Sequence, residues 1–443
     1  MHRTLQIPEI IASICHEIPP LSRGRLHRET SATLAALART CKAFSGPALN
    51  ILCMPEDLWE FIGDPTSSAP IELVLRRPVV LSDWERLLVY TQRVKGFSYY
   101  YDDNLDCPLN FFKVLRLCLP HQYLFPSIET LNWIVKKIRY FCILSSFVEK
   151  LTLPCLDRVA LAHVAQLPTF VSLTLTDPII AAPNPPGGHH FANLQFLHIR
   201  DTTAVDVLLE LFTLLLHSPV VDILAPFPNQ TPSPKIAQLY AALAPSPSRT
   251  SLSILKLRPK SRQRLPGTAT AAECISSHQL RPLLMFLHLT SVTLCAPAGF
   301  DLNDATVGDM ARAWPRIKSL HLYASDYAHI PSKVTLGALI LLARHCPELS
   351  GLSLTLDATA PVPDLETENE RLRQWRLESL GVSLSPIAAP LAVAVFLSSI
   401  FPELKWVRGD DMQYKSWAEV EKALPALRKA RAEEEHWFRR GQS

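Results

Sequence analysis

One pattern of apolar and polar positions recurs along this chain. It reads apolar, two other residues, apolar, one other residue, apolar, and the clearest copies contain a proline just ahead, at 167–175, 314–322 and 346–354. The alternation that closes each copy predicts a short strand with one buried face. About twelve copies lie between 97 and 407, so the mean period is about 28 residues.

The other copies close with the same alternating triplet, at 97–99, 131–133, 151–153, 197–199, 255–257, 292–294 and 380–382. Two copies are degraded, Leu224-Ala225-Pro226 and Val407-Arg408-Gly409. Segments of helical length precede many strands; residues 335–345, for example, place Leu336, Leu339 and Ala343 on one face. Proline then ends the helix, because it disfavours helical geometry in the residue before it. Each unit is therefore a helix, a turn and a strand.

A single helix-strand unit cannot bury its apolar face, but stacked neighbours can, and the period is typical of leucine-rich repeats. We predict an α/β fold, a leucine-rich-repeat solenoid of about twelve irregular repeats with a parallel concave sheet and helices outside. An ordinary α/β sheet is the alternative. The expected domains are a small helical segment over 1–55, the repeats over 56–411 and a charged helix or cap over 412–443.

The first fifty residues depart from the repeat and predict two helices. Pro8 suits a first helical position, and Glu9 suits the positive end of a helix. Two stretches carry a resemblance, Leu5-x-Ile7-Pro8-Glu9-Ile10-Ile11-x-x-Ile14 and Leu34-x-x-Leu37-Ala38-Arg39-Thr40-Cys41-Lys42-Ala43-Phe44. Together they resemble an F-box, and more narrowly the fungal (basidiomycete-type) F-box proteins with irregular leucine-rich repeats.

The resemblance implies a substrate-recognition subunit of a Skp–cullin–F-box E3 ubiquitin ligase. The F-box-like segment would bind a Skp-family adaptor, which joins it to a cullin complex, and the repeats would bind a target protein. By this resemblance the adaptor contacts are Leu5, Ile7, Pro8, Glu9, Ile10, Ile11, Leu34, Leu37, Cys41 and Phe44. The alternative for this segment is a cap that covers the first repeat. The alternative for the chain is a repeat scaffold for protein interactions, without ligase function.

Polar residues between the inward leucines are the candidates for target binding, although each could simply be a solvated surface residue. They are Thr174, His198, Lys256, Arg258, His321 and Ser353. No acidic residue lies between Asp222 and Glu273, whereas seven basic ones do, which predicts a positive patch, placed on a loop, for an acidic or phosphorylated partner. No aromatic residue interleaves with the basic run from Arg249 to Arg264, so nucleic acid is not expected.

The sequence contains none of the common motifs for catalysis or for metal or nucleotide binding. The ten cysteines form no Cys-x-x-Cys pair and no zinc-type spacing with histidine, so buried free thiols are expected. Neither a nucleophile elbow nor a phosphate-binding loop is present, and we expect no enzymatic activity, cofactor or metal.

The apolar stretch 387–401 is about 15 residues long, which predicts a buried helix rather than a membrane span. The start of the sequence lacks a continuous apolar leader segment, so a cytoplasmic or nuclear location, or both, is expected.

Overall fold

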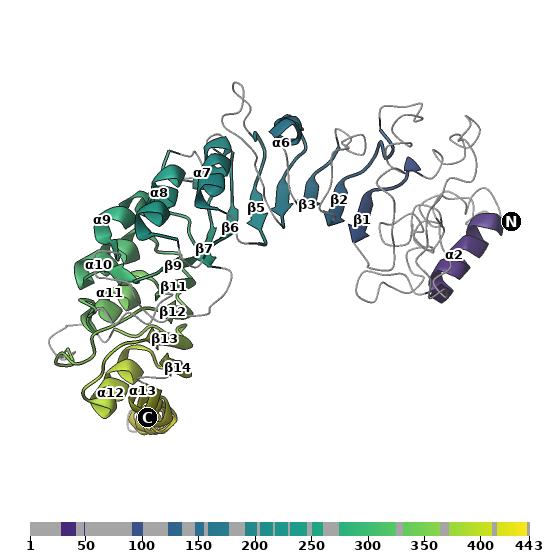
Figure 1. Ribbon diagram of the computed structural model, residues 1–443. Coiled ribbons are helices and arrows are strands. Elements are labelled where there is room, and N and C mark those ends of the chain that lie inside the picture. The colour runs from purple at the N-terminus through teal and green to yellow at the C-terminus, as the bar shows by residue number, and fades with distance from the viewer. Residues whose placement is uncertain are drawn as a thin grey trace. The chain divides into compact units, whose positions relative to one another are not determined.

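The computed structural model describes residues 28–40, 48, 91–100, 123–134, 147–154, 158–176, 191–201, 204–215, 218–228, 231–245, 250–259, 274–324, 331–363, 372–409 and 414–440. The chain divides into two compact units, Met1–His189 and His190–Ser443. Parallel strands follow one another in chain order within each unit (Figure 1). The predicted α/β class is thereby confirmed, while one solenoid running through both units stays a prediction.

Unit 1 contains α2 (Arg28–Thr40), β1 (Gly96–Tyr100), β2 (Thr130–Ile134), β3 (Lys150–Leu153), α6 (Arg158–Ala165) and β4 (Ser172–Leu175). Strands β1 to β4 pair in parallel and in register. The register aligns Leu131, Leu151 and Leu173, and each of these side chains is buried. These leucines are the first apolar position of the closing triplets, so the repeat pattern places the core of unit 1 as predicted.

Unit 2 contains β5 (Phe196–Ile199), α7 (Val205–Leu214), β6 (Asp222–Phe227), α8 (Ser233–Leu243), β7 (Ile254–Pro259), β8 (Ile275–Ser276), α9 (Ser277–Leu280), the 3-10 helix η5 (Arg281–Met285), β9 (Ser291–Ala296), β10 (Phe300–Asp301), α10 (Asp304–Ala313), β11 (Ser319–Ala324), α11 (Gly337–His345), β12 (Gly351–Ser353), β13 (Ser379–Ser383), α12 (Pro390–Ile400), β14 (Trp406–Gly409) and α13 (Tyr414–Arg440). The main strands run in the order β5-β6-β7-β9-β11-β12-β13-β14, and β8 pairs separately with β10. Helices α7 to α12 follow one side of these strands (Figure 1).

One inward row of side chains crosses the main strands of unit 2. The strand register aligns Leu197, Ile223, Leu255, Val292, Leu320, Leu352, Leu380 and Val407. Each of these side chains is at most 2% exposed. The degraded copy at 224 has a different register from the one its triplet suggests, because Ile223 and Ala225 point inward and Leu224 lies on the other face. Every residue from Ile223 to Phe227 is apolar, so the alternation there does not identify the buried face.

A second regularity joins neighbouring repeats just before each strand begins. Two successive backbone N–H groups donate to one carbonyl of the preceding repeat; Ser350 and Gly351, for example, both donate to Lys318. The accepting carbonyls in unit 2 belong to Gln195, Val221, Ser253, Thr290, Lys318, Ser350 and Glu378. We call this series the strand-start ladder.

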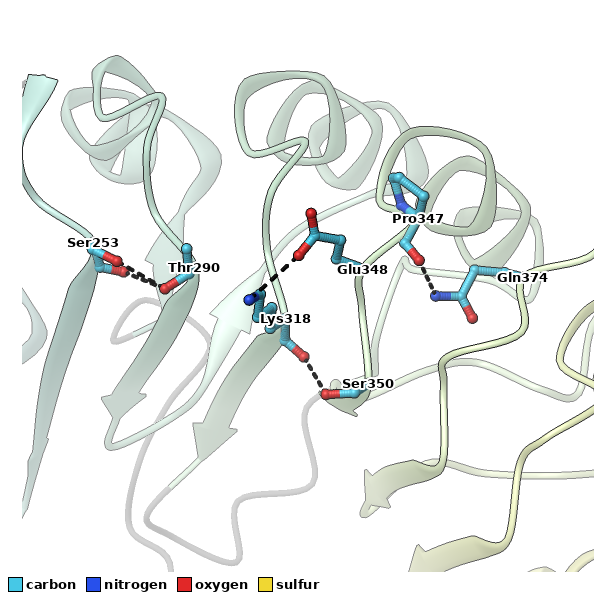
Figure 2. Close-up of polar contacts among 7 residues, drawn as sticks. All are labelled: Ser253, Thr290, Lys318, Pro347, Glu348, Ser350 and Gln374. Atoms are coloured by element: carbon cyan, nitrogen blue, oxygen red, sulfur yellow. Dashed lines mark hydrogen bonds and ion pairs between the residues drawn. The ribbon is translucent and has the colours of Figure 1, made fainter.

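Side chains reinforce the strand-start ladder (Figure 2). Ser350 Oγ donates to the Lys318 carbonyl at 3.0 Å, and Lys318 Nζ lies 3.4 Å from Glu348 Oε2. Ser253 Oγ and Thr290 Oγ1 share a hydrogen bond of 2.9 Å. These bonds satisfy the turns at which the chain enters the sheet, and so they hold the strands in register.

Helix α13 packs on β14 and α12 at the end of unit 2. Three residues of the predicted stripe, Trp417, Val420 and Leu424, are buried, and the fourth, Leu427, is half-buried. The indole Nε1 of Trp417 donates to the Ser385 carbonyl at 2.8 Å. Helix α12 buries Phe396 but leaves Leu391 68% exposed, so the helix predicted over 387–401 forms but is not fully buried.

Candidate functional site

The face of the main sheet in unit 2 opposite the inward leucines carries a second aligned row. We call it the strand-face row; it consists of His198, Leu224, Lys256, Thr293, His321, Ser353, Gly381 and Arg408. Neighbouring parallel strands lie roughly 4.8 Å apart, so successive residues of the row are spaced at about that interval. Four of the six predicted target-binding residues therefore share one line on one face.

The other two predicted residues lie off this row. Arg258 is two positions after Lys256 on β7, so both side chains share the same face. Thr174 belongs to β4 of unit 1, where it is 9% exposed and aligns with Thr152. The structure therefore brings five of the six predictions together within unit 2.

His321 is the most constrained side chain of the strand-face row. Its Nε2 lies 2.7 Å from Ser319 Oγ, its Nδ1 lies 2.9 Å from Ser353 Oγ, and its ring stacks on Tyr323 with centroids 5.6 Å apart. Both serines can donate or accept, so either neutral tautomer fits. The imidazole is held in one orientation by β11 and β12, which makes it a fixed hydrogen-bonding feature of the face.

The glycine beside Ser353 explains how tightly this part of the face is packed. A β-carbon built on Gly381 would lie 2.5 Å from Ser353 Oγ and 3.2 Å from its Cβ. Real β-carbons do not approach that closely, so only glycine leaves room for Ser353 to meet His321. The sequence shows the glycine but gives no signal for this contact, because its partner belongs to the preceding repeat.

His198 makes a side-chain hydrogen bond to an acidic residue of the next strand. Its Nε2 lies 3.0 Å from Asp222 Oδ2, a contact between β5 and β6. Asp222 Oδ1 is buried without a hydrogen-bond partner. One oxygen of this carboxylate therefore contacts His198 and the other is buried, so Asp222 is not a candidate for binding a target.

Lys256 and Arg258 differ from both histidines, because neither has a side-chain hydrogen bond or ion pair within the described part of the chain. Both are half-buried. Strand register places Leu224 and Thr293 beside Lys256, and Pro226 beside Arg258. The positive patch predicted on a loop is thus partly on a strand. Lys235 is instead on α8, where its Nζ pairs with Asp206 at 2.9 Å.

The row contains two polar or basic residues that the sequence reasoning did not select, Thr293 and Arg408. Arg408 lies over the ring of Trp406, 5.8 Å from its centroid, and the Trp406 side chain is 52% exposed. Thr293, in the middle of the row, was also missed. The same alternation that selected His321 would have found Thr293, which stands between the buried Val292 and Leu294. Arg408 gave a weaker signal, because its copy of the pattern ends in Gly409 instead of a third apolar residue.

The predicted adaptor-binding residues fall mostly outside the described part of the chain. Those outside it are Leu5, Ile7, Pro8, Glu9, Ile10, Ile11, Cys41 and Phe44. Leu34 and Leu37 are on α2, where Leu34 is fully buried and Leu37 is half-buried. Leu34 is thus a core residue, and Leu37 keeps some surface that a partner could reach.

Burial holds two ionisable groups of unit 2, the Cys346 thiol and the Tyr240 hydroxyl, in their neutral forms. Burial raises the pKa of the Cys346 thiol to about 12. The pKa of the Tyr240 hydroxyl is also raised, mainly by burial and to a smaller extent by the nearby Cys295. Cys274, Cys295 and Cys346 are buried thiols that form no disulfide with one another. The residues described contain no group of three or more His, Cys, Asp or Glu side chains that could hold a metal ion. None of the helices described is long and apolar enough to cross a membrane.

Comparison with known proteins gives little. No family model matches the chain, and no curated protein matches it in sequence. Among solved structures the chain is similar to one from the crystal structure of the yeast Rad7 and Elc1 complex, with 16% identity and a TM-score of 0.35. The similarity covers 60% of this chain and 63% of the other, so this chain spans less than two thirds of that protein's length.

Proposed function

We propose that this chain is the substrate receptor of a Skp–cullin–F-box ubiquitin ligase. The N-terminal helices bind a Skp-family adaptor, and the strand face binds a target protein. The adaptor half rests on the two F-box-like stretches at 5–14 and 34–44. The observation that carries the target half is the strand-face row, an aligned set of residues on one face of the sheet that are mostly polar or basic.

The receptor has no reaction of its own in this proposal. It holds a target beside the ubiquitin-charged partner of the ligase and so raises the local concentration of the reacting groups. That role needs a preorganised binding surface rather than a catalytic residue or cofactor. The fixed imidazole of His321 and the close contact of Gly381 with Ser353 give the strand face that rigidity.

Co-purification of the full chain with a Skp-family adaptor tests the adaptor half. The informative variant is Pro8→Ala/Ile10→Asp, which disturbs the start of the first helix and puts a charge into its apolar stripe. Leu391→Asp is the matched control, because it adds the same charge at a residue that is 68% exposed on α12. We expect stoichiometric binding by the wild type and the control, and loss of binding by the N-terminal variant with an unchanged circular dichroism spectrum.

The opposite result separates the two candidate functions. If the folded wild type does not bind any Skp-family adaptor, the ligase role is wrong. The chain is then a repeat scaffold whose partners meet the strand face alone. Equal loss in Leu391→Asp would also count against a specific N-terminal site, because it would trace the effect to added charge.

A further inference from the structure

The strands of unit 2 carry an unequal distribution of charge. The eight main strands contain one acidic residue, Asp222, against the three permanently basic residues Lys256, Arg258 and Arg408. Asp222 is already paired with His198. Arg408 has the Trp406 ring beneath it. The two charges on β7 are therefore the ones on this face with no partner in the described chain.

Within the described part of the chain, the side chains that the register places beside Lys256 and Arg258 carry no negative charge. On the side of β6 the aligned neighbours are Leu224 and Pro226, and on the side of β9 the neighbour of Lys256 is Thr293. The sequence has no acidic residue from 223 to 272. Asp222, which begins β6 and aligns with Ile254, shares the face of Lys256, but its Oδ2 lies 3.0 Å from His198. Half-buried cations flanked by apolar side chains have lost part of their hydration, and an incoming anion would restore that interaction.

We propose that the β7 face binds an extended acidic segment of a partner protein, with carboxylates two residues apart. The proposal rests on the receptor role above, because it names the kind of target that the strand face selects. Lys256 and Arg258 are at positions i and i+2 of a strand, so their α-carbons are about 6.6 Å apart along β7. Alternate side chains of an extended peptide have the same spacing and share one face.

That spacing favours two carboxylates over one phosphate. A single phosphate is best held by basic groups that converge on it, whereas these two cations are set apart along one strand. Nucleic acid is disfavoured because the aligned neighbours of Lys256 and Arg258 are Leu224, Pro226 and Thr293, none of which has an aromatic ring on which a base could stack. The occupant is therefore a peptide with glutamate or aspartate at alternate positions.

Fluorescence anisotropy with the full chain tests the proposal. The probe is a labelled 12-residue peptide with four glutamates at alternate positions between serines. A second peptide has the same composition with the glutamates in one block, a third carries a single phosphoserine, and an oligothymidine of equal net charge is the fourth probe. We expect the alternating peptide to bind at least about tenfold more tightly than the others, with affinity falling as salt rises.

The variant Lys256→Gln/Arg258→Gln keeps the long stems and removes both charges. Its matched control is Lys415→Gln/Lys422→Gln, two exposed residues of α13, which gives the same change in net charge. We expect the β7 variant to bind the alternating peptide at least about tenfold more weakly and the control to stay within about twofold, with both proteins unfolding at the wild-type temperature.

Three outcomes would overturn the proposal. They are equal weakening in the control, tighter binding of the block, phosphoserine or oligothymidine probe, and no binding of the alternating peptide by the wild type. None of these depends on the adaptor, so the Pro8→Ala/Ile10→Asp variant separates the two ideas. That variant should lose the adaptor and keep the peptide. If the wild type fails to bind adaptor but binds the alternating peptide, the ligase role fails while the acidic site stands.

Discussion

Gly381 on β13 leaves no room for a β-carbon, because one built there would lie 2.5 Å from the Oγ of Ser353 on β12. Ser353 in turn holds Nδ1 of His321 at 2.9 Å. The contact between His321 on β11 and Ser353 on β12 therefore requires that residue 381 on β13 has no β-carbon. Replacing glycine with alanine in a strand is ordinarily neutral or favourable, so a cost at this position would report the contact itself.

We predict that Gly381→Ala destabilises the protein by about 1–3 kcal/mol, the usual range for overpacking. The measurement is the free energy of unfolding in urea. Gly351→Ala is the matched control on the adjacent strand, since its nearest contact would be Ser379 Oγ at an ordinary 3.5 Å. A loss of stability in the control equal to that in Gly381→Ala would show that Ser353 is not the cause.

The buried side chain of Gln374 forms several hydrogen bonds to backbone groups near the starts of β12 and β13. Its Nε2 donates to the Leu349 carbonyl at 2.7 Å and to the Pro347 carbonyl at 3.2 Å (Figure 2), and its Oε1 accepts from the backbone N–H of Leu377 at 2.8 Å. The residue is 2% exposed. We predict that Gln374→Ala costs about 2–4 kcal/mol, because several buried backbone groups lose their partner at once.

Urea unfolding again measures this loss, and Arg376→Ala is its control. The Arg376 side chain is exposed, and its backbone N–H still donates to Gln374 in the variant. The control should change the free energy of unfolding by less than about 0.5 kcal/mol. A mild effect of Gln374→Ala, no larger than that of the control, would mean that water replaces the amide.

The fold was predictable from the sequence to the extent that the alternation was unambiguous. Each triplet with one polar residue between two leucines became a strand with the leucines inside, as at Leu320 and Leu352. The pattern failed at Leu224, where five successive apolar residues removed the contrast between the faces. It also gave no warning of the small sheet of β8 and β10, since these two-residue strands have no triplet.

The candidate site was predictable only in part, for a similar reason. Alternation tells which side chains of one strand share a face, so His321 and Lys256 could be selected. It does not tell which repeats align, and the row from His198 to Arg408 needed the register. Two side-chain contacts show which residues of the row already have a partner: His198 with Asp222, and His321 with Ser353. Each contact joins two different repeats, so the sequence around either residue does not indicate it.

The anchoring of α13 gives a third prediction. Trp417 is fully buried, and its indole N–H donates to the Ser385 carbonyl at 2.8 Å. Trp417→Phe keeps an aromatic ring but leaves that carbonyl without its donor, so we expect a loss of about 1–3 kcal/mol. The helix should also become more sensitive to trypsin, because its packing on β14 and α12 weakens. The 52% exposed Trp406, changed to Phe, is the control and should show neither effect.

Cys346 gives a prediction about pH. Burial raises the pKa of its thiol to about 12 in the folded state, above its ordinary value of 9.0. A raised folded pKa means that the folded protein keeps the proton while the unfolded chain loses it, so stability is full below pH 9 and falls between pH 9 and pH 12. The free energy of unfolding of the wild type should therefore decrease more steeply with pH in that window than that of Cys346→Ala. Parallel pH profiles for the two proteins would contradict the prediction.

The Cys346 thiol should also resist a disulfide reagent at pH 8 until urea unfolds the chain, since only the thiolate reacts and the folded site keeps the thiol protonated.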